Sequence, residues 1–140
     1  MHRYSPPLFL AFLLRHTESG RCPDRQAALT IELRTDWFPF YSIRVGDTQK
    51  GNKTIFEKNS FFVVNRRYKE TICLDHTEQN CYEFSLADSG GEGLIHTDGN
   101  WGYYSLVWDE EPLVHRGTFE GPFETISFGL GCPGSAPKEL

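Results

Sequence analysis

The chain has 140 residues, of which 39% are hydrophobic and 14% aromatic, a composition that suits one folded domain and excludes a disordered polypeptide. Its formal net charge of -5 excludes a general electrostatic attraction to nucleic acid or to anionic membrane surfaces. The 11 Phe and 6 Tyr favour strands, and the 13 Gly and 8 Pro disfavour long helices.

Residues 1–26 are expected to form a leader or linker. His2 and Arg3 precede an apolar run at residues 8–14, and residues 17–19 offer small side chains for cleavage. This is the order of features in a short signal peptide, with a plain disordered leader as the alternative. The run is too short to cross a membrane, so no transmembrane segment is expected.

Eight segments with alternating, β-branched or aromatic character follow, separated by turn residues. In the first, Leu29, Ile31 and Leu33 are expected to face a core. Short strands at this spacing predict an all-β protein, an antiparallel, jelly-roll-like β-sandwich of about eight strands over residues 27–132, with a flexible tail at 133–140. The expected strands are residues 27–35, 41–45, 56–64, 67–74, 81–87, 102–108, 113–119 and 125–130.

The chain has four cysteines and no C-x-x-C pair, which favours disulfide bridges over zinc and indicates an oxidising compartment. Four cysteines allow three connectivities. Residues 75–80 are expected to be a hairpin loop, which makes a local Cys73–Cys81 bridge the best of the three. Cys22 and Cys132 then pair by elimination.

A second signal of secretion lies in the hydrophilic loop at residues 46–54. Asn52 begins the N-glycosylation sequon Asn52-Lys53-Thr54. Together with the cysteines, it leads us to expect a secreted, extracellular glycoprotein.

The stretch at residues 81–93, C-Y-E-F-S-L-A-D-S-G-G-E-G, carries the most distinctive pattern in the chain. It begins as a strand and stops at an acidic, glycine-rich turn that starts at Asp88. Asp88-Ser89-Gly90-Gly91 matches the sequence around the nucleophile of trypsin-like proteases, but the chain is too short for two barrels and lacks the order of a triad. The sequence around Asp88 also resembles the signature of aspartic proteases, which need two such aspartates.

The same acidic loop is a candidate calcium site. Asp88, Glu92, Asp98 and Asn100 offer hard oxygen ligands on a glycine-rich loop, although their spacing is not that of an EF-hand. The alternative is that the glycines only permit positive φ at a tight bend and the acidic side chains are solvated.

Aromatic residues near turns are candidate sugar-binding residues. Trp37, Trp101 and Tyr103 could stack on sugar rings, with core or rim packing as the alternative. Strand alternation predicts that Tyr103 and Tyr104 face opposite sides of the sheet.

Residues 81–94 resemble an extracellular β-domain with the motif C-Y-x-F-x-h-x-D-S-x-G-D-G-h, where h is apolar, found in predicted secreted and surface proteins of microalgae. T-D-W-F-P at residues 35–39, T-I-C-L at 71–74, G-Y-Y-S-L at 102–106 and G-T-F at 117–119 fit the same pattern. The resemblance implies a β-sandwich without catalytic activity. The chain departs from the motif where Glu92 replaces Asp and Gly90 replaces an aromatic residue, and the longer Glu92 would shift a calcium-binding carboxylate.

These features predict a non-catalytic extracellular module that binds a glycan or another protein, with no nucleic-acid partner and with Ca²⁺ as the candidate cofactor. One alternative is a small protease-like hydrolase that uses Asp88 or Ser89. It requires a concave site with a second polar group in hydrogen-bond reach of one of these side chains. A second alternative is a structural spacer domain.

Overall fold

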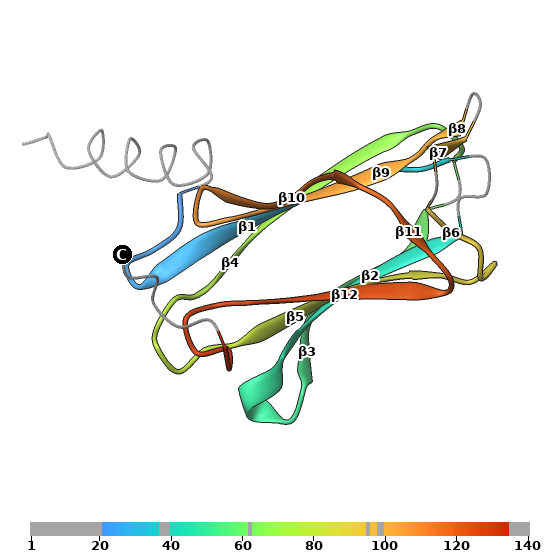
Figure 1. Cartoon of the computed structure of the whole chain (residues 1–140). Helices are drawn as coiled ribbons and strands as arrows, with labels where there is room; N and C mark the ends of the chain where they lie inside the picture. The colour runs from blue at the N-terminus through green and yellow to red at the C-terminus, as the bar shows by residue number, and fades with distance from the viewer. Residues whose placement is uncertain (1–20, 37–39, 62, 95, 98–99, 135–140) are drawn as a thin grey trace, which may run out of the picture.

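The computed structural model describes residues 21–36, 40–61, 63–94, 96–97 and 100–134, without the side chains of residues 60, 61, 96, 97, 100 and 101 (Figure 1). The signal-peptide pattern before residue 21 and the tail after residue 134 therefore lie outside the described residues. Within the described residues, no helix is long and apolar enough to cross a membrane.

Eight strands form two four-stranded sheets that lie one above the other in Figure 1, and every pairing within them is antiparallel. This arrangement confirms the predicted antiparallel β-sandwich. The first sheet contains, in order, β10 (Glu111–Gly117), β9 (Tyr103–Trp108), β1 (Gln26–Arg34) and β4 (Arg67–Asp75). The second sheet contains, in order, β12 (Phe123–Phe128), β5 (Tyr82–Asp88), β2 (Tyr41–Asp47) and β3 (Lys53–Phe61).

Short elements close one end of the sandwich. β6 (Gly93–Leu94) pairs with β11 (Phe119–Glu120), and β7 (His96–Thr97) pairs with β8 (Asn100–Trp101). At the other end, the 3-10 turn η1 (Thr48–Lys50) joins β2 to β3, and the Asp47 carboxylate accepts the backbone N–H of Gln49 at 3.0 Å. The acidic turn after Asp88 thus lies at the end that β6 and β11 close.

The core lies between the sheets and follows the alternation of the sequence. Leu29, Ile31 and Leu33 are buried as expected, and so are the alternate residues of β5. Aromatic rings fill one end: the Trp108 ring centroid lies 5.1 Å from that of Phe128. The largest fully buried side chains are Tyr82, Tyr104, Phe84, Leu29, Ile31, Leu33, Ile43, Leu86, Leu94, Leu106 and Val45.

Several strand boundaries differ from the prediction. β3 occupies Lys53–Phe61 and not residues 56–64, and β2 runs on to Asp47, so four of the nine residues of the expected loop at 46–54 are strand. β10 and β12 each begin two residues earlier than expected. Leu130 consequently lies beyond the end of β12 and is 53% exposed, because the strand that would have turned it into the core ends at Phe128.

The expected hairpin at residues 75–80 is wrong. β4 pairs with β1 in the first sheet, whereas β5 pairs with β2 and β12 in the second. The connection therefore crosses from one sheet to the other, and its flanking cysteines are not cross-strand neighbours.

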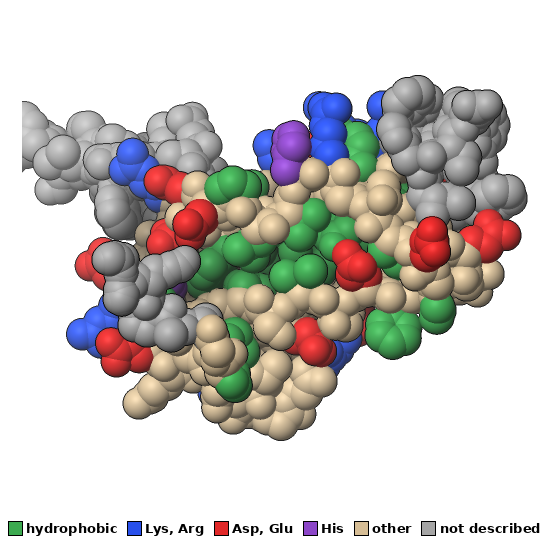
Figure 2. Space-filling model, in the orientation of Figure 1, with side chains coloured by type: hydrophobic (Ala, Val, Ile, Leu, Met, Phe, Trp, Pro, Cys, Tyr) green, Lys and Arg blue, Asp and Glu red, His purple; other side chains and the backbone are tan. Residues whose placement is uncertain are grey.

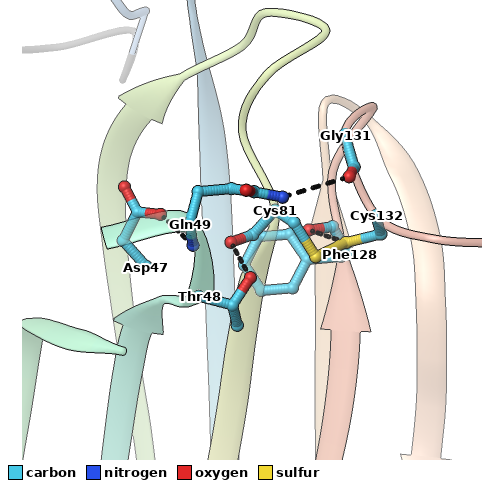
Figure 3. Close-up of a disulfide and its surroundings, with 7 residues drawn as sticks. All are labelled: Asp47, Thr48, Gln49, Cys81, Phe128, Gly131 and Cys132. Atoms are coloured by element: carbon cyan, nitrogen blue, oxygen red, sulfur yellow. Dashed lines mark hydrogen bonds between the residues drawn. A yellow bond between two sulfur atoms is a disulfide. The ribbon is translucent and has the colours of Figure 1, made fainter. Parts of the chain in front are cut away.

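The predicted disulfide pairing is wrong for the same reason. The bridges are Cys22–Cys73 and Cys81–Cys132, each joining residues 51 positions apart. Cys73 is exposed on the outer side of β4, where it meets the segment that leads into β1. Cys81 is buried at the start of β5 beside the chain that follows β12 (Figure 3).

Hydrogen bonds hold the segments around the buried bridge in place. The Thr48 hydroxyl donates to the Cys81 carbonyl at 2.9 Å, and the Gln49 side-chain amide donates to the Gly131 carbonyl at 3.4 Å (Figure 3). The two disulfide loops do not overlap in sequence, so each bridge restricts a separate part of the unfolded chain.

Candidate functional site

The Asp88 side chain organises the acidic turn. Asp88 ends β5 and is only 3% exposed. Its Oδ1 accepts the backbone N–H of Gly90 at 3.0 Å, and its Oδ2 accepts those of Glu92 at 3.0 Å and Gly93 at 2.7 Å. These three hydrogen bonds to backbone amides fix the conformation of the turn.

Glycine is needed in this turn for two reasons. Gly91 and Gly93 have φ values of 80° and 92°, in the left-handed region. At Gly93 a Cβ atom would also lie 2.3 Å from the Phe119 carbonyl oxygen, because β6 pairs closely with β11. The glycines therefore permit both the bend and the contact between the two strands.

The Ser89 hydroxyl is hydrogen-bonded to the main chain just before β2. It is exposed, and both its hydroxyl and its backbone N–H donate to the Phe40 carbonyl, at 3.2 and 3.0 Å. His76 lies near the Tyr82 end of β5, where its ring meets that of Trp108 edge-on at 5.3 Å. Because a strand of this length spans about 20 Å, His76 is too far from Ser89 to act as its base.

Tyr41 and Asp36 form a buried polar pair beneath the turn. The Tyr41 hydroxyl lies 2.8 Å from Asp36 Oδ2, to which it donates, and 3.2 Å from the Gly93 carbonyl. Burial is the main cause that raises the pKa of the Tyr41 hydroxyl far above its ordinary value, and the Asp36 hydrogen bond and the charges of Asp36, Asp88 and Glu92 add to it. Tyr41 therefore stays a neutral donor.

The sequence interpretation missed Asp36 as a member of this end of the sandwich. The only signal for it was its place in the T-D-W-F-P segment, directly before the expected second strand. Asp36 is 2% exposed, a burial that strand periodicity could not have predicted for a turn residue.

The predicted calcium ligands are only partly described. Asp88 and Glu92 lie on the same turn, whereas Asp98 and the side chain of Asn100 lie outside the described residues. Among the described residues, no group of three or more His, Cys, Asp or Glu side chains is arranged to hold a metal ion. Calcium binding by this loop therefore stays a prediction.

Of the predicted sugar-binding aromatics, only the side chain of Tyr103 is described; Trp37 and the side chain of Trp101 lie outside the described residues. Tyr103 faces the outer side of the first sheet and Tyr104 faces the core, as alternation predicted. The Tyr103 ring is nevertheless only 9% exposed, because the Arg116 guanidinium lies 4.9 Å above it. Tyr103 as it stands is not an open stacking platform.

The glycosylation candidate is accessible. Asn52 is exposed between η1 and β3 and has a φ value of 61°. The Arg44 guanidinium donates to the Asn52 carbonyl at 2.5 Å and to the Thr54 hydroxyl at 2.8 Å. These contacts order the sequon on the surface, and modification of Asn52 stays a prediction.

The fold and the turn define a disulfide-bonded antiparallel β-sandwich whose most distinctive motif is a hydrogen-bonded acidic turn. Comparison with protein-family models, with curated proteins and with solved structures gave no match.

Proposed function

We propose that the protein is a non-catalytic extracellular module that binds a glycan or another protein. The observation that carries this proposal is the set of backbone partners of Asp88. A carboxylate that is 3% exposed and held by three amide donors serves the shape of a turn and offers a substrate little access.

The hydrolase alternative has less support. Ser89 donates to a backbone carbonyl, and His76 lies at the other end of β5. A nucleophile requires a base in hydrogen-bond reach, and the described residues supply none to Ser89.

The two disulfides support the extracellular part of the proposal. Disulfide bridges persist in oxidising compartments and are rare where thiols are kept reduced. A structural spacer domain would also carry such disulfides, so only a binding measurement distinguishes a binding module from a spacer.

The test is a sedimentation assay with the oxidised protein and a panel of insoluble neutral and acidic polysaccharides. We expect retention in the pellet without release of soluble sugars, and no cleavage of casein. Turnover of a polysaccharide or of casein that is lost in Ser89→Ala would establish the hydrolase. If no member of the panel retains the protein, the glycan-binding function is excluded.

A further inference from the structure

A row of basic side chains crosses the outer face of the first sheet. Arg34 on β1 lies directly opposite Arg67 on β4 and, on its other side, opposite Tyr103 on β9. Like charges placed directly opposite each other on neighbouring strands are destabilising. The fold nevertheless brings these two arginines together from positions far apart in the sequence.

Two further cations extend the row. Lys69 lies on the same face of β4, two residues from Arg67. Arg116 on β10 places its guanidinium 4.9 Å from the Tyr103 ring centroid. We call Arg34, Arg67, Lys69 and Arg116 the basic row.

A single carboxylate lies within the row. Glu32 Oε2 accepts the Tyr103 hydroxyl at 3.2 Å and lies 3.3 Å from Arg67 Nε. Arg34 donates through Nη2 to Asn65 Oδ1 at 3.3 Å, and its Nε is buried without a partner among the described residues. Four cations and one carboxylate leave this part of the face with an excess of positive charge.

A groove of about 540 Å³ continues from the row along the same face. Small side chains, those of Ala28, Thr30 and Thr71, contribute to its lining, and Lys69 stands where it meets the basic row. Asp109 and Glu110 bound it at the β9–β10 turn. Its volume falls within the range of sites for small ligands, and its polar lining suits hydroxylated sugars.

We propose that this face binds an acidic polysaccharide, with sugar rings in the groove and sulfate or carboxylate groups on the basic row. Guanidinium groups bind such oxyanions with parallel hydrogen bonds, and those of Arg67 and Arg116 are exposed on this face. The acids at the far end of the groove direct the anionic groups toward Lys69. Figure 2 shows Lys and Arg side chains along the upper side of the molecule, over the first sheet.

A polysaccharide fits better than a nucleic acid. The disulfides indicate an oxidising compartment, where polysaccharides and not nucleic acids are the abundant polyanions. The inference rests on the proposed binding function and assigns that function to one surface and one class of ligand.

The test measures the affinity of the oxidised protein for soluble dextran sulfate and alginate, with neutral dextran and duplex DNA as comparisons. In Arg67→Gln/Lys69→Gln we expect the affinity for the acidic polymers to fall at least about tenfold, since two charged contacts are lost. The matched control is Lys50→Gln/Lys53→Gln, which removes the same charge from η1 and the start of β3 and should leave the affinity unchanged. Thermal melting of each variant establishes that it is folded.

Three outcomes would overturn the inference: no binding of dextran sulfate or alginate by the wild type, an equal loss in the control variant, or equal or tighter binding of duplex DNA. If the wild type sediments with a neutral polysaccharide but does not bind dextran sulfate or alginate, the binding function stands and only its assignment to the basic row fails.

Discussion

The backbone N–H of Gly93 donates to Asp88 Oδ2 at 2.7 Å, the shortest of the three hydrogen bonds that join this carboxylate to its turn. The bond links the end of β5 to the start of β6, and so connects the second sheet to the pair of short strands that closes the sandwich. The turn whose sequence most resembles a protease signature thus has a structural role: it connects the second sheet to β6.

Replacing Asp88 with Asn tests this role. An amide group cannot accept all three N–H donors, so at least one buried N–H is left unsatisfied. We expect the free energy of unfolding to fall by about 2 to 3 kcal/mol, measured by urea denaturation. Glu92→Gln, at an exposed position on the same turn, is the control and should change stability by less than about 0.5 kcal/mol. Equal effects of the two substitutions would contradict the structural role of Asp88.

A pair of alanine substitutions separates backbone strain from steric overlap. Gly91 and Gly93 both have positive φ, but only at Gly93 does a Cβ meet a neighbour, the Phe119 carbonyl at 2.3 Å. We expect Gly91→Ala to lower the free energy of unfolding by about 1 kcal/mol and Gly93→Ala to lower it by more than about 3 kcal/mol, both measured by urea denaturation. Similar values for both would show that β6 and β11 do not pack as closely as described.

The connectivity of the disulfides can be read directly by peptide mapping. Cleavage after Glu78 separates Cys73 from Cys81, and mass spectrometry without reduction should then find Cys22 linked to Cys73 and Cys81 linked to Cys132. A Cys73–Cys81 peptide would restore the pairing that the sequence suggested.

The two bridges should also differ in accessibility. Cys73 is exposed, whereas Cys81 and Cys132 are 3% and 9% exposed, so mild reductant should open the Cys22–Cys73 bridge first. Removing either bridge by a double Ala substitution should lower stability by about 2 to 4 kcal/mol, because each closes a long loop. Alkylation of the freed thiols at increasing reductant gives the order of opening.

Stability should fall at alkaline pH. Burial, with the charges of Asp75 and Asp47, raises the pKa of Tyr82 from 10.0 to about 12. A raised pKa means that the folded state favours the protonated phenol, so this stabilisation is complete below pH 10.0 and is lost as the pH rises toward about 12. Denaturation of wild type and Tyr82→Phe across this range should show a smaller decline in the variant, and parallel curves would contradict the prediction.

Calcium can be tested by thermal melting in calcium and in chelator. Since the Asp88 oxygens already accept three backbone N–H groups, we expect the turn to hold its shape without a metal and the melting temperature to be unchanged. An increase in calcium that is lost in Asp98→Asn would instead establish the metal site that the acidic loop suggested.

The inward faces of the strands could be predicted because they depend on local alternation. Leu29, Ile31 and Leu33 occupy every second position, and any sheet that buries one of them buries all three. The same reasoning correctly separated Tyr103 from Tyr104. It failed at the ends of β3, β10 and β12, where the limits are set by the length of the partner strand.

Which strands are neighbours depended on the tertiary structure. Residues 75–80 have the length and polarity of a hairpin loop, and nothing local distinguishes a hairpin from a crossing between sheets. Because the connection crosses between the sheets and is not a hairpin, both disulfides differ from the predicted pairing. In the same way, the sequence groups Arg67 only with Arg66 and Lys69. Its meeting with Arg34 and Arg116 on one face requires β1, β4, β9 and β10 to lie side by side. Local side-chain patterning determined which residues are buried, and long-range strand pairing decided which of the rest come together.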